Sequence, residues 1–105
     1  MVVSRSFKTM VEDRLARDPD FREALLRESV EAMLSGDIET GKAVLRDYIK
    51  ATIGFEALGA TVGKPPKSLI RMFGPKGNPT AGNLFAVIGQ LQRQVGVTLH
   101  VSATH

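Results

Sequence analysis

The stretch that decides the fold is GFEALGATVGKPPKSLIRMFG, residues 54–74. Its apolar residues keep helical spacing on both sides of a central glycine, which favours two short helices. Two such helices, joined by three or four residues, pack near a right angle only if a small residue lies at their crossing and a glycine turns the backbone. Gly59 and Gly63 suit these two roles. The spacing therefore predicts a helix-turn-helix, with helices over 55–62 and 66–73.

The second of these helices is predicted to have a polar, cationic outer face. Pro66 fits its first turn, where a missing N–H group costs nothing. Such a helix is what the major groove of DNA accepts, whereas cations in the flanking turn and loop favour phosphate contacts. The candidate DNA-binding residues are Lys64, Pro66, Lys67, Ser68, Ile70, Arg71, Lys76 and Asn78.

The positive charge is concentrated around this predicted helix-turn-helix. The chain has 105 residues and a formal net charge of +3. Beyond residue 50 it carries five Lys or Arg against the single acid Glu56, and four of the five cations lie between residues 64 and 76. A charge run by itself is usually a solvated face, but beside a helix-turn-helix pattern a local positive field favours a nucleic-acid partner. The alternative is an ordinary helical corner whose charges form a solvated face.

Start and stop signals divide the rest of the chain into further helices. Asp18 before Pro19 and Asp37 after Gly36 are predicted N-caps, and Asn78 with Pro79 is predicted to begin the last helix. At this length we expect one domain. It would contain an N-terminal helical extension over 1–36, a DNA-binding core over 37–95 and a strand or tail over 96–105.

The C-terminal residues VGVTLHVSATH, 95–105, alternate in polarity. Val97, Leu99 and Val101 alternate with polar residues, which is the period-two pattern of a strand with one apolar face. A lone strand needs a partner, so we expect it to pair with its twin in a homodimer or to extend the sheet of another protein. The alternative is a frayed terminus.

Several classes of function have little support in the sequence. There is no cysteine, and His100 has no companion ligand, so we expect no metal site and no cofactor. The loop GPKGNPTAGN matches neither of the common glycine-rich phosphate motifs, and no base is placed beside a nucleophile, so we expect no enzyme and no small-molecule substrate. The chain has neither a signal-peptide core nor a long apolar run, which favours a cytoplasmic protein without membrane contact.

Residues 45–91, LRDYIKATIGFEALGATVGKPPKSLIRMFGPKGNPTAGNLFAVIGQL, resemble a known family. They are similar to the small Xre-like helix-turn-helix regulators known as addiction-module antidote proteins, or HigA-like antitoxins. The resemblance implies an all-α, lambda-repressor-like bundle, here of about six helices with a short C-terminal β-strand. It also implies a homodimer that binds double-stranded operator DNA and represses its own operon, commonly together with a RelE-like toxin. In that family's arrangement 55–62 is the positioning helix and 66–73 the recognition helix.

A second function, of another class, is left open by the sequence. In this hypothesis the N-terminal helices and the terminal strand bind a partner protein, and the helix-turn-helix has only a structural role. DNA binding measured over a series of salt concentrations distinguishes a DNA-binding regulator from a protein-interaction module.

Overall fold

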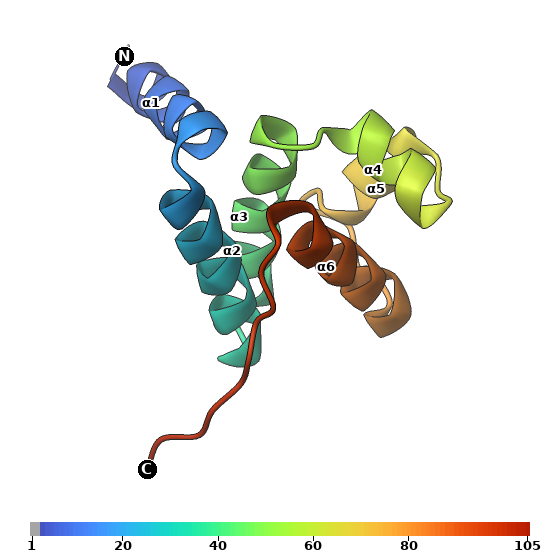
Figure 1. Cartoon of the computed structure of the whole chain (residues 1–105). Coiled ribbons are helices and arrows are strands. Elements are labelled where there is room, and N and C mark those ends of the chain that lie inside the picture. The colour runs from blue at the N-terminus through green and yellow to red at the C-terminus, as the bar shows by residue number, and fades with distance from the viewer. Residues whose placement is uncertain (1–2) are drawn as a thin grey trace.

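The computed structural model describes residues 3–105, with side chains from residue 9 onward, and the regular secondary structure of this part is entirely α-helical (Figure 1). The helices are α1 (Val3–Arg17), α2 (Pro19–Leu34), α3 (Ile38–Ala51), α4 (Phe55–Val62), α5 (Pro66–Met72) and α6 (Ala81–Val95). The predicted all-α class and the count of about six helices are confirmed. Among the described residues, no helix is long and apolar enough to cross a membrane.

Side-chain caps begin three of the helices. Asp18 accepts a hydrogen bond from the Phe21 N–H group at 3.2 Å, and Asp37 accepts one from the Thr40 N–H group at 3.2 Å, as their sequence positions predict. The bond from Phe21 is the main reason why the pKa of Asp18 lies below its ordinary value. The last helix begins later than expected: α6 starts at Ala81, and its cap is Thr80.

Helices α2 and α3 form a closely packed antiparallel pair joined by a short turn. Gly41 allows the close approach, because a Cβ atom at this position would lie 2.9 Å from the Ser29 carbonyl oxygen and would overlap the Met33 side chain. Ser29 is itself fully buried, and its hydroxyl donates to the Leu26 carbonyl oxygen at 2.8 Å. The polar side chain is therefore satisfied within its own helix.

One cluster of buried side chains joins all six helices. Helices α4, α5 and α6 lie to one side of α3, and α1 and α2 lie to the other (Figure 1). The N-terminal extension therefore shares a core with the helix-turn-helix. The cluster contains Leu15, Leu26, Leu45, Tyr48, Ile49, Phe55, Leu58, Leu69, Phe73, Val87, Ile88 and Leu91.

The predicted C-terminal strand is wrong. Residues 97–105 are extended, but no strand is formed in the described part of the chain, and the tail runs down beside α2 (Figure 1). The Leu99 N–H group donates to the Gln92 side-chain oxygen at 2.7 Å, and the Leu99 side chain packs against the core. Of the three alternating apolar residues, Leu99 is therefore packed by the chain's own helices, whereas Val101 remains 79% exposed.

Candidate nucleic-acid interface

The turn between α4 and α5 has the geometry that its glycines predict. Gly63 ends α4 with φ 72°, in the left-handed region that favours glycine. Gly59 is fully enclosed, since a Cβ atom there would lie 2.5 Å from the Lys64 carbonyl oxygen. Pro66 occupies the first turn of α5. The sequence-predicted helix-turn-helix is thus present, with α5 ending at Met72 instead of Phe73.

Helix α5 has one buried face and one exposed face. Leu69 is 0% exposed and Phe73, which follows the helix, is 1% exposed. On the opposite face Lys67 and Arg71 are exposed, and Ile70 is 49% exposed. The two cations are one helical turn apart, with the isoleucine beside them, so this face can present donors and an apolar contact to the same ligand.

The remaining predicted contact residues differ in exposure. Lys76 and Asn78 are exposed in the loop after α5, as a contact role requires. Lys64, Pro66 and Ser68 are half-buried, so they offer only part of their surface. Among the described residues no ion pair involves a cation of α5 or of the segments that flank it, because all four described ion pairs lie in residues 14–47. The positive charge of this surface is therefore not neutralised locally.

Lys42, in α3, is a component of this region that the sequence analysis missed. Its side chain is 2% exposed, and its Nζ atom donates to the carbonyl oxygens of Gly74, at 3.2 Å, and Gly77, at 2.5 Å. The Glu39 carboxylate lies 3.2 Å from the same nitrogen but is 71% exposed. Lys42 therefore fixes the loop that leaves α5. The available signal was a lysine three residues before Leu45, on the apolar side of α3.

The loop over residues 74–80 is held in place by its own backbone bonds as well as by Lys42. The Gly74 N–H group donates to the Arg71 carbonyl oxygen at 3.1 Å, and the Gly77 N–H group donates to the Gly74 carbonyl oxygen at 3.0 Å. A Cβ atom on Gly77 would overlap the carbonyl oxygens of Arg71 and Met72. The glycine thus lets the loop lie against the end of α5, where it presents Lys76.

Tyr48 is a second buried polar residue of α3. Its side chain is 0% exposed, and its hydroxyl has no hydrogen-bond partner among the described residues. Burial raises the pKa of Tyr48 above its ordinary value of 10.0, and the Arg22 charge opposes the rise in part. The folded protein therefore favours the neutral phenol.

We expect this burial to make stability fall in alkaline solution. Because the pKa is raised in the folded state, the stability that Tyr48 contributes is complete below pH 10 and is lost as the pH rises toward the folded-state pKa. Urea unfolding of wild type and Tyr48→Phe between pH 9 and about pH 11.5 isolates this loss as a difference between the two proteins. Equal pH dependence in both would contradict the expectation. Tyr48 is the only tyrosine, so phenolate absorbance reports its titration directly.

The described residues show no metal cluster beside this surface, and the comparisons with known proteins found no match. The described residues contain no group of three or more His, Cys, Asp or Glu side chains that could hold a metal ion. Comparisons with protein-family models, with curated proteins and with solved structures found no match for this chain. Any proposal about function therefore depends on the chain's own sequence, geometry and charge.

Proposed function

We propose that this chain is a sequence-specific DNA-binding regulator in which α5 reads base edges in the major groove. The observation that carries the proposal is the outer face of α5, where Lys67, Ile70 and Arg71 are exposed while Leu69 is fully buried. Neither of the two cations forms an ion pair with a described carboxylate. Arg can offer a bidentate donor pair to guanine, and an apolar side chain can contact the methyl group of thymine. Lys76, on the fixed loop, is placed to contact phosphate.

The finer assignment, an antitoxin that represses its own operon with a RelE-like toxin, is supported by the resemblance of residues 45–91 to that family. An operator with two-fold symmetry is bound by a protein with the same symmetry, so we also propose a homodimer. Because no strand is formed over residues 97–101 and Leu99 packs on its own core, we place the contact between subunits on another surface. Phe85 on α6 is a candidate, because it is aromatic and 63% exposed.

Loss of the Arg71 guanidinium is expected to reduce discrimination between DNA sequences. We expect Arg71→Ala to lower the preference for a selected site over random DNA by about 5- to 150-fold, since a bidentate base contact contributes about 1–3 kcal/mol of discrimination. Gel shifts with a site selected from a random library measure the ratio. Arg27→Ala, on the exposed side of α2, is the matched control and should leave the ratio unchanged.

The contrasting expectation is for Lys76→Ala, which should weaken binding to all sequences alike. It should also reduce the slope of log affinity against log salt concentration by about 0.9. If Lys67→Ala and Arg71→Ala both retain the affinity and preference of wild type, α5 is not the reading helix. The alternative function, a protein-interaction module, would then be favoured.

The homodimer is tested by sedimentation of the purified chain at micromolar concentration. We expect a dimer for wild type and a monomer for Phe85→Asp, because the substitution would bury a charge in the contact. Leu34→Asp is the matched control, since Leu34 on α2 is also 63% exposed. A dimer that is lost in Leu34→Asp and kept in Phe85→Asp would place the contact on the α2 side of the molecule instead.

One observation supports the interaction module as a second candidate. Leu34 and Val101 are exposed beside a hollow of about 410 Å³ that lies between α2 and the tail. Exposed apolar groups at the edge of a hollow are typical of protein contact surfaces. DNA binding by wild type that is absent, or that shows no salt dependence, would favour this candidate.

A further inference from the structure

A cavity of about 310 Å³ lies where α1, α2, α3 and α6 meet. Its walls are mainly apolar and include Leu15, Ile53 and Val95. Arg22 and Tyr48 are also part of the lining. A mainly apolar hollow of this size with a few polar groups is the usual form of a small-ligand site.

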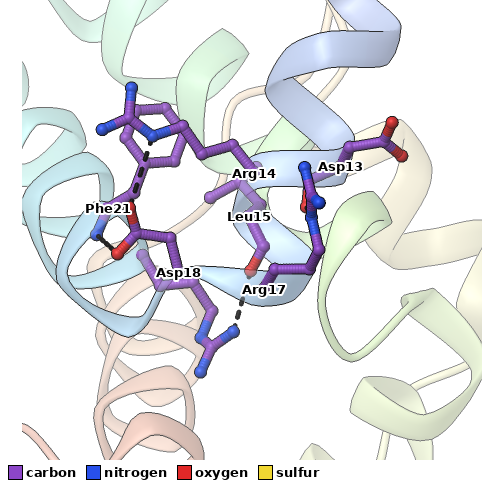
Figure 2. A network of polar contacts seen from close by, with 7 residues as sticks. Asp13, Arg14, Leu15, Arg17, Asp18 and Phe21 are labelled. Atoms are coloured by element: carbon purple, nitrogen blue, oxygen red, sulfur yellow. Dashed lines mark hydrogen bonds and ion pairs between the residues drawn. The ribbon is translucent and has the colours of Figure 1, made fainter.

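Arg22 brings positive charge to this cavity without a matching acid. One of its terminal nitrogens donates to the Leu15 carbonyl oxygen at 2.9 Å, the dashed line that ends on Leu15 in Figure 2. Neighbouring side chains at the α1–α2 junction already pair with each other: Arg14 contacts Asp18 and lies 4.6 Å from the centre of the Phe21 ring. Arg22, which is half-buried, forms no ion pair with any described carboxylate.

Tyr48 brings a second polar group without a partner to the wall of the same cavity. A buried hydroxyl without a hydrogen-bond partner destabilises a protein, and a phenylalanine would avoid that cost. The hydroxyl of Tyr48 has no partner among the described residues, although the Arg22 charge is close enough to influence its ionisation. A ligand oxygen beside Arg22 would accept hydrogen bonds from both the guanidinium group and the Tyr48 hydroxyl. Because the hydroxyl is closed to solvent, the side chains that line the cavity have to move apart slightly before a ligand oxygen can accept its hydrogen bond.

We propose that this cavity binds a small organic monoanion, a carboxylate attached to a short apolar body. The carboxylate accepts hydrogen bonds from Arg22 and Tyr48, and the apolar body packs against Leu15, Ile53 and Val95. The site is independent of the DNA-binding proposal, since it lies on other residues. A ligand held here contacts both the N-terminal extension and the core.

Hexanoate is a suitable probe, with 1-hexanol as its uncharged counterpart. We expect calorimetry to show saturable binding of hexanoate with a Kd of about 1 mM, in the range of small, low-affinity ligands, and much weaker binding of the alcohol. The chain has one tyrosine and no tryptophan, so a saturable change in intrinsic fluorescence reports on Tyr48 alone. Absence of saturation at about ten-fold higher concentration, or equal binding of hexanol, would overturn the proposal.

Four variants locate the binding. Arg22→Gln should weaken hexanoate at least about 10-fold and Tyr48→Phe about 5-fold, because charge-assisted hydrogen bonds are the stronger ones. Arg27→Gln, on the same helix but outside the cavity lining, should bind like wild type. Ala51→Leu should fill the cavity and abolish binding without loss of helix content, which keeps the test decisive if Arg22→Gln fails to fold. Wild-type affinity in either Arg22→Gln or Ala51→Leu would overturn the assignment.

Discussion

Lys42→Met is expected to destabilise the protein by about 3 kcal/mol, the largest loss among the substitutions considered. Methionine keeps most of the apolar stem but removes the ammonium group that donates to the Gly74 and Gly77 carbonyl oxygens. The Gly74 carbonyl oxygen keeps the hydrogen bond from the Gly77 N–H group, whereas the Gly77 carbonyl oxygen loses the donor that the structure gives it. A buried acceptor left without a donor costs about 1–3 kcal/mol. Urea unfolding followed by circular dichroism measures the change. Because the loop carries Lys76, DNA affinity should fall together with stability.

Two matched variants separate this effect from the loss of a charge. Lys50→Met removes an exposed lysine from the last turn of α3 and should change stability by no more than about 0.5 kcal/mol. Glu39→Gln should also have a small effect, because the Glu39 side chain is 71% exposed and its ion pair with Lys42 is screened by water. A Lys42→Met protein as stable as Lys50→Met would show that the loop is held by other contacts.

Gly59→Ala is expected to cost about 2 kcal/mol, although alanine is the better helix former. The added Cβ atom would meet the Lys64 carbonyl oxygen, and a backbone atom at a helix crossing cannot move without displacing α5. The helix-forming gain, about 1 kcal/mol, offsets only part of this strain. Thermal unfolding should show a lower midpoint, and sequence-specific DNA binding should weaken because the orientation of α5 changes.

Gly89→Ala in α6 is the matched control for the same chemical change. Its Cβ atom would approach only the Arg93 side chain, at 3.8 Å, which is an ordinary contact. We therefore expect Gly89→Ala to stabilise the protein by about 0.5–1 kcal/mol. If the two substitutions shift stability in the same direction, the crossing of α4 and α5 is looser than the contact at Gly59 indicates.

Local signals were sufficient to predict the helices and the turn. An N-cap side chain acts within three residues, as for Asp18, and a positive φ is a property of one residue, as for Gly63. The outer face of α5 follows from helical periodicity in the same way, so Lys67 and Arg71 were placed correctly on an exposed face. These features depend on near neighbours, which the sequence displays directly.

Features that depend on distant segments were not predictable in this way. The bonds of Lys42 join residues 32 and 35 positions apart, and its place on the buried side of α3 gives no indication of their partners. The alternation of Val97 and Leu99 was interpreted as a strand because a period of two does not specify what covers the apolar side. A helical surface of the same chain covers Leu99 here, and the Gln92 side chain accepts the hydrogen bond of its N–H group.

The contacts of Lys42 have a consequence for synthesis of the protein on the ribosome. Helices α2 and α3 are adjacent in the chain and can pair as soon as both have emerged, whereas the carbonyl group of Gly77 is made 35 residues after Lys42. At a typical elongation rate of about 5–20 residues per second, Lys42 waits for about 2–7 seconds before its acceptors exist. During that interval its ammonium group stays in water, and the adjoining surface of α3 stays open. The nascent helical pair is therefore exposed to chaperones and proteases until the loop after α5 closes over it.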